Sequence, residues 1–111
     1  MKIQRALSVR QPHAENILRG TKKIEYRSTR THIRERVYIY ASTKPADAEL
    51  FAKLGRQSGD LPTGVLVGTV EIVGCTQKGE RDFHWHLANP KKLTKRLKPK
   101  NQPQPVWFRP F

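Results

Sequence analysis

Lys22, Glu25 and Arg27 bring two cations and a carboxylate together within six positions of the chain. A carboxylate held between cations can orient a basic side chain for catalysis or anion binding, and the same arrangement is also a common surface salt bridge. The alternation of Ile24 and Tyr26 with Glu25 and Arg27 has the period of a half-buried strand. We therefore expect Ile24 and Tyr26 to face a core, with the charged pair on the opposite face.

Glu71 is the second carboxylate that could take part in chemistry, because it interrupts residues 63–75, the longest apolar run of the chain. Burial without a partner would disfavour its charged form, so it should be protonated or meet a cation. Lys22 and Arg27 are the expected partners if their strand lies beside this one. Such a pair can be structural or the acid/base element of a site, so the candidate catalytic residues are Lys22, Glu25 and Glu71.

The chain is strongly basic: 22 Lys and Arg stand against 9 Asp and Glu, giving a formal charge of +13 and a pI near 10.5. A field of this sign attracts polyanions, and nucleic acid is the usual polyanionic partner of a small basic domain. A basic surface without a specific partner is the alternative. Candidate nucleic-acid contacts are Arg10, Lys22, Arg27, Arg30, Arg34, Arg36 and an exposed Trp85 that stacks a base.

Length and composition exclude several classes of protein. A chain of 111 residues with 36% hydrophobic residues suits one domain with one modest core, which we expect to be a monomer. We find no apolar run near the roughly 20 residues of a membrane span and no signal-type segment, so we expect a cytoplasmic protein without membrane contact. A single cysteine excludes an internal disulfide, and His84 with His86 lacks a convincing third ligand, so we expect no metal and no cofactor.

Periodicity and turn residues predict a chain of short alternating elements. Pro12 opens a helix that Gly20 ends, and Gly68 and Gly74 should mark bulges in a central strand. The expected elements are strands at 3–9, 24–27, 37–41 and 63–75, helices at 12–19 and 46–54, and a turn or short helix at 83–89 that Pro90 stops. Residues 91–105, basic and proline-spaced, should be irregular, and 106–109 should form a closing strand anchored by Trp107.

Gly20, Lys22, Glu25 and Arg27 fit the pattern G-x-K-x-x-E-x-R, which resembles the signature of the ASCH domain family, named for a transcription coactivator. Further matches follow in order along the chain, at 7–12, 61–64, 68–71, 85–90 and Trp107. The resemblance implies a single ASCH-like domain over 1–111. It also implies an α+β fold: a small mixed, mostly antiparallel PUA-like β-barrel with about two flanking helices.

The resemblance leaves two functions open. Some ASCH-like proteins hydrolyse N4-acetylcytidine nucleosides with a threonine three residues after the motif lysine, and Glu25 occupies that position here. Others cleave RNA or bind nucleic acid, and in the family the motif lysine and the carboxylate matching Glu71 face one cleft. We favour an RNA-binding domain with a cleft for a base or modified nucleotide, since a free nucleoside gains nothing from the high charge. The alternative is a small hydrolase of RNA or acetylcytidine.

Overall fold

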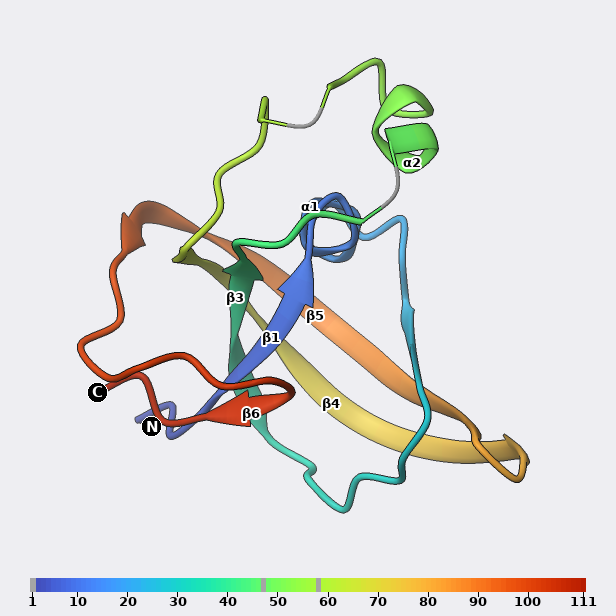
Figure 1. The fold of residues 1–111 in the computed structure, drawn as a ribbon. Coiled ribbons are helices and arrows are strands. Elements are labelled where there is room, and N and C mark those ends of the chain that lie inside the picture. Colours follow the sequence, from blue (N-terminus) through green and yellow to red (C-terminus); the bar gives the residue numbers. More distant parts are fainter. Residues whose placement is uncertain (1, 47, 58) are drawn as a thin grey trace.

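The computed structural model describes residues 2–46, 48–57 and 59–111, which form a six-stranded mixed sheet with two helices (Figure 1). The α+β class predicted from the sequence is therefore confirmed. The strands are β1 (Ala6–Arg10), β2 (Ile24–Arg27), β3 (Arg36–Ser42), β4 (Val65–Gly79), β5 (Asp82–Leu97) and β6 (Trp107–Phe108), and the helices are α1 (His13–Arg19) and α2 (Ala48–Ala52). In this described part of the chain, neither helix is long and apolar enough to cross a membrane.

The strands follow the order β2-β5-β4-β3-β1-β6 in one sheet. β1 and β3 run parallel, and the other neighbours pair antiparallel, as expected for a mixed, mostly antiparallel sheet. Figure 1 shows the long β4–β5 hairpin curving behind β1 and β3. The end strands β2 and β6 are not paired with each other, so the sheet is open and the closed barrel is not confirmed.

Helix α1 begins one residue after the predicted Pro12 and ends where its sequence predicts. Pro12 precedes it, and Gly20 adopts the left-handed conformation with φ of 83° while its N–H donates to carbonyls of the last turn. Glycine reaches this conformation at little steric cost, which makes it a common helix end. The apolar stripe Ala14, Ile17 and Leu18 is buried against the sheet. Of the second predicted helix, 46–54, residue 47 lies outside the described residues, and the structure has a helix over Ala48–Ala52.

Gly68 brings α1 close to β4. The pairing of β4 with β5 shifts register between Leu66 and Gly68 and again between Ile72 and Gly74, which confirms the predicted bulges. A Cβ at position 68 would lie within 2.6 Å of the Lys91 carbonyl oxygen and still nearer to a methyl group of Leu18. The absence of a side chain at Gly68 is therefore what lets the helix and two strands meet.

The region after Gly79 differs from its sequence prediction. Residues 83–89 were expected to form a turn or helix, and 91–105 to be irregular, yet β5 runs continuously through Asp82–Leu97. Only 98–105 are irregular as expected. The alternating burial of Phe83, Trp85 and Leu87 explains the strand, since a period of two is that of an extended chain. Pro90 does not end it, because Asn89 takes a positive φ of 52° beside a register shift that leaves the proline outside the regular ladder.

The C-terminal segment returns to β1. β6 pairs antiparallel with β1 through Ala6 and Leu7, so the predicted closing strand exists, over Trp107–Phe108 rather than 106–109. The Trp107 ring stacks on Trp85 with centroids 5.7 Å apart and planes inclined by 9°. Trp107 therefore packs against the core through Trp85, and its anchoring of the tail stays a prediction. The first strand starts at Ala6 instead of Ile3.

Replacing Gly68 by alanine should destabilise the fold by about 1–3 kcal/mol, the usual cost of overpacking a well-filled core. The reason is that the new methyl group would meet a backbone oxygen that cannot rotate away. Urea denaturation followed by circular dichroism measures the change in the free energy of unfolding. Gly79→Ala is the matched control in the same strand, where the nearest atom to an added Cβ lies at 3.5 Å. Equal stability of the two variants would contradict close packing at Gly68.

Candidate functional site

Glu25 lies buried between two cations. Glu25 is 7% exposed. One of its carboxylate oxygens lies 2.7 Å from Arg27 Nη2, and the other lies 3.6 Å from Lys22 Nζ. Arg27 Nε also donates to Glu25 at 2.9 Å. The side chains of both cations are largely buried too, so solvent screens these ion pairs less than it would on the surface. The three motif residues therefore form one ion triad, Lys22–Glu25–Arg27.

Strand β2 shows the reverse of the orientation predicted for it. Ile24 and Tyr26 were expected to face the core, but Tyr26 is 60% exposed and Glu25 points inward. The physical reason lies in the register with β5, where Glu25 stands opposite the buried Trp85 and Tyr26 opposite His84. Residues opposite one another share a face of the sheet, so Glu25 lies on the same face as the buried Trp85 of β5. The charged face of β2 consequently lines the interior side of the sheet.

Arg27 spans the opening between the two sides of the sheet. Its Nη2 donates to the Ser8 carbonyl oxygen of β1 at 2.9 Å, although β1 and β2 are not paired strands. The guanidinium also lies 5.5 Å from the Trp85 ring centroid, a cation–π distance. Together with the Trp85–Trp107 stack, this bridge joins strands at the two ends of the sheet through side chains.

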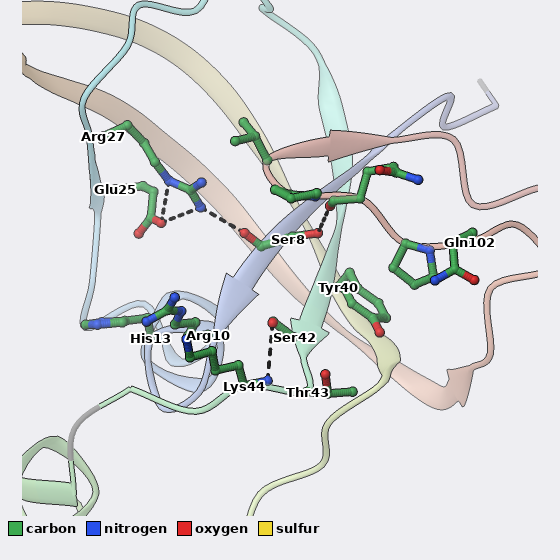
Figure 2. Close-up of a pocket in the computed structure, with 14 residues that line it drawn as sticks. Ser8, Arg10, His13, Glu25, Arg27, Tyr40, Ser42, Thr43, Lys44 and Gln102 are labelled. Atoms are coloured by element: carbon green, nitrogen blue, oxygen red, sulfur yellow. Dashed lines mark hydrogen bonds and ion pairs between the residues drawn. The ribbon is translucent and has the colours of Figure 1, made fainter.

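A cleft of about 610 Å³ lies beside this bridge (Figure 2). Because β1 and β3 are parallel with Arg10 opposite Ser42, their carboxyl ends bring Arg10 and the segment 42–44 to the same edge. Figure 2 shows these groups facing the Glu25–Arg27 pair across the cleft. The lining residues are Ser8, Arg10, His13, Glu25, Arg27, Tyr40, Ser42, Thr43, Lys44 and 102–106.

Residues 102–106 form a strap along the cleft. The Ser8 hydroxyl donates to the Gln104 carbonyl oxygen at 2.7 Å, and the Ser8 N–H donates to the Val106 carbonyl oxygen at 2.9 Å. Val106 adopts a positive φ of 66°, which is unfavourable for a β-branched residue and marks a sharp change of chain direction before β6. Ser8 thus holds the strap on one side while its own carbonyl holds Arg27 on the other.

His13 contributes a neutral imidazole to the cleft. Burial lowers its pKa from the ordinary value, the nearby Lys22 and Arg27 lower it further, and Glu25 opposes them. A histidine with a lowered pKa is uncharged at neutral pH, so it offers an aromatic face and one donor and one acceptor nitrogen. The cleft therefore combines cations, hydroxyls and one neutral ring.

Comparison of the sequence with known proteins identifies its family. The family model described as "ASCH domain" matches residues 7–97, which include Leu7–Arg10 of β1 and the ion triad. The chain belongs to the ASCH domain family. Among curated proteins, it is 27% identical over 91% of its length to human "Activating signal cointegrator 1" and 26% identical to the mouse protein of that name. The chain spans 21% of the length of these relatives.

Glu71 does not join the ion triad of this ASCH domain. We expected it beside Lys22 or Arg27, but its carboxylate pairs with Arg36 Nη2 at 3.1 Å on the neighbouring strand β3. The buried Val70 and Ile72 face the core, so Glu71 points to the opposite side of β4 and its side chain is 38% exposed. The expected single cleft containing both carboxylates is therefore wrong.

The other predicted contacts have diverse environments. Arg30 lies over the Phe83 ring and donates to Gln77, Arg34 donates to nearby backbone carbonyls, and Arg36 is held by Thr69, Glu71 and the Asn89 carbonyl. Trp85 is 1% exposed and donates its indole N–H to the Thr29 carbonyl, so the expected exposed stacking role is wrong. Of the predicted residues, the structure brings Arg10, Glu25 and Arg27 into the cleft, with Lys22 behind Glu25.

Sequence reasoning missed several cleft residues, chiefly Ser8, Ser42, Thr43 and Lys44. A usable signal was present for the last three, since they follow the strongest predicted strand at the point where its chain leaves the sheet. The parallel pairing of that strand with β1, which brings the two ends together, was not deducible from composition. Ser8 lies in the family-like segment 7–12, but its role depends on contacts with residues 19 and 96 positions away in the sequence and could not be read from it.

The lowered pKa of His13 predicts an acid-sensitive component of stability. Below the unfolded pKa of about 6.5, the unfolded chain binds a proton that the folded cleft resists, so the free energy of unfolding falls as pH drops toward the folded pKa. Denaturant titrations between pH 7.5 and 5 should therefore show a shallower loss for His13→Gln than for the wild type. His32→Gln, at an exposed histidine, is the control. Parallel pH profiles for the wild type and His13→Gln would contradict the assignment.

Proposed function

We propose that this ASCH domain binds RNA and that the cleft between β1 and β2 receives an unpaired base or modified nucleotide. The observation that carries the proposal is the convergence of the exposed Arg10 and Lys44 with the Glu25–Arg27 pair on one cleft in a chain of charge +13. Phosphate contacts supply most of the affinity of a protein for nucleic acid, and they need cations that are free to reach the backbone.

The exposed rim and the interior of the cleft suit different parts of a nucleotide. Arg10 and Lys44 are exposed beside the hydroxyl groups of Ser42 and Thr43, a combination that suits a phosphate. Inside, the Glu25–Arg27 pair has a fixed geometry because each partner is anchored by further contacts. A fixed donor and acceptor can read the edge of an unstacked base, as proteins do when they recognise single-stranded RNA.

The expected PUA-like architecture fits this proposal. The Arg27–Ser8 bridge and the Trp85–Trp107 stack span the place where backbone pairing would close a barrel. A side-chain bridge, unlike a hydrogen-bonded ladder, leaves room for a cleft between the strands. We propose that the opening of the sheet is the nucleotide entrance.

A hydrolytic function is the second candidate, favoured by the neutral His13 near the Glu25 carboxylate in the cleft. A neutral imidazole can accept a proton in general base catalysis. Lys22 and Glu25 stay together as candidate catalytic groups, whereas Glu71 lies on the other face of β4. Glu25 also replaces the threonine hydroxyl of the acetylcytidine hydrolases that the sequence resembles, so binding is the preferred function.

Replacing Arg10 and Lys44 together by alanine should weaken RNA binding and flatten its salt dependence. Each lost phosphate contact should reduce the slope of log affinity against log salt by about 0.7 on a single strand, or about 1.4 for the pair. Fluorescence anisotropy with a labelled single-stranded RNA, measured between about 50 and 200 mM salt, gives the slope. The matched control is Lys78→Ala with Arg81→Ala, which removes the same charge from exposed positions around the β4–β5 turn (Figure 1).

An equal loss of slope in both double variants would show that only net charge matters and would overturn the assignment of the cleft. The same incubations, extended to N4-acetylcytidine and analysed for products, test the second candidate. If the wild type forms product and Glu25→Gln does not, the function is hydrolysis rather than binding alone. Unchanged RNA and acetylcytidine would leave binding as the function.

A further inference from the structure

The outer face of β2 presents an aromatic ring to solvent. Tyr26 is 60% exposed, and its phenol ring is held by Lys22 Nζ, 4.9 Å from the ring centroid, and by an edge contact with His84 at 4.8 Å between centroids. The ring is therefore supported on a strand and still has much of its surface free. An exposed tyrosine of this kind is a rigid platform on which a planar group can stack.

A second hollow of about 600 Å³ adjoins this ring. Asn16 lines it from α1, and Thr21, Lys22 and Lys23 line it from the turn between α1 and β2. His13 lines both this hollow and the cleft described above, so the two sites meet at one side chain. A ligand longer than one nucleotide can therefore pass from the cleft across His13 to Tyr26.

We propose that Tyr26, Lys22 and Lys23 form a second nucleotide subsite, in which an unpaired nucleobase stacks on Tyr26 while Lys23 contacts a phosphate. The proposal rests on the proposed RNA binding of the cleft and extends it to the neighbouring residue of the same strand. It takes single-stranded nucleic acid as its ligand, because a base in a duplex has its faces covered by its neighbours.

The charges favour a nucleobase over a peptide at this surface. Lys22 is paired with the Glu25 carboxylate. Lys23, in contrast, is exposed and forms no ion pair among the described residues, so its charge is available to a phosphate. A peptide pairing with the edge of β2 would use backbone groups and would not need the tyrosine ring. Stacking on an aromatic ring flanked by lysines is what single-stranded nucleic acid uses.

The experiment compares two ligands with the same phosphates. An eight-residue uridine chain carries bases, and a stable abasic analogue of the same length does not. Tyr26→Ala should lose about tenfold in affinity for the uridine chain, since stacking of one base on an aromatic side chain is worth that order of magnitude. The same variant should bind the abasic analogue as the wild type does, and Tyr26→Phe should stay within about twofold on both ligands because it keeps the ring.

A loss for Tyr26→Ala that is equal on both ligands would overturn the stacking proposal, as would an unchanged affinity for the uridine chain. If the wild type binds neither ligand, the proposed function fails along with the subsite. If Arg10→Ala with Lys44→Ala weakens binding while Tyr26→Ala does not, only the subsite fails.

A direct signal for the stacking comes from Tyr26→Trp. The two native tryptophans stack on each other against the core, so a tryptophan at position 26 reports on the surface. Its fluorescence should be quenched on addition of the uridine chain and unchanged with the abasic analogue. Phe111→Trp is the matched control, since Phe111 is 51% exposed near the C-terminus. Equal quenching of both variants would contradict a stacking site at Tyr26.

Discussion

The organisation of the cleft depends on the buried carboxylate of Glu25. Lys22 and Arg27 both approach it, and Arg27 then reaches the Ser8 carbonyl across the opening of the sheet. Without the carboxylate, two largely buried cations would lose their compensating charge, which is far more costly than losing an exposed pair. One acidic side chain therefore fixes both the position of a cleft arginine and the distance between strands that the backbone does not join.

The cleft and the outer face of β2 follow from the same alternation of side chains. Because Glu25 and Arg27 point inward, Tyr26 must point outward from the strand between them. Lys22 contacts both sides, pairing with Glu25 and lying near the Tyr26 ring. A short charged strand thus supplies a fixed polar pair to one hollow and an aromatic platform to another, with His13 lining both. This arrangement suits a ligand with repeating units.

The sequence predicted the positions of helices, turns and bulges better than it predicted which face of each strand points to the core. The glycine that ends α1, the bulges at Gly68 and Gly74 and the Lys22–Glu25–Arg27 grouping were all readable, because local conformation and short spacing determine them. The orientation of β2 was not, since it depends on the register with β5 and the burial of Trp85. Glu71 shows the same limit: its apolar neighbours indicated burial, but its partner Arg36 comes from strand pairing that spacing does not encode.

Nuclear magnetic resonance of the ¹⁵N-labelled protein during titration with a short single-stranded RNA tests the central claim most directly. Binding in the cleft should shift together the amide signals of residues that line this one hollow: Ser8, Arg10, Glu25, Arg27, Ser42, Thr43, Lys44, Gln102 and Gln104. The turn between β4 and β5 should change little. Shifts centred on that turn, with the cleft amides unmoved, would contradict a nucleotide site between β1 and β2.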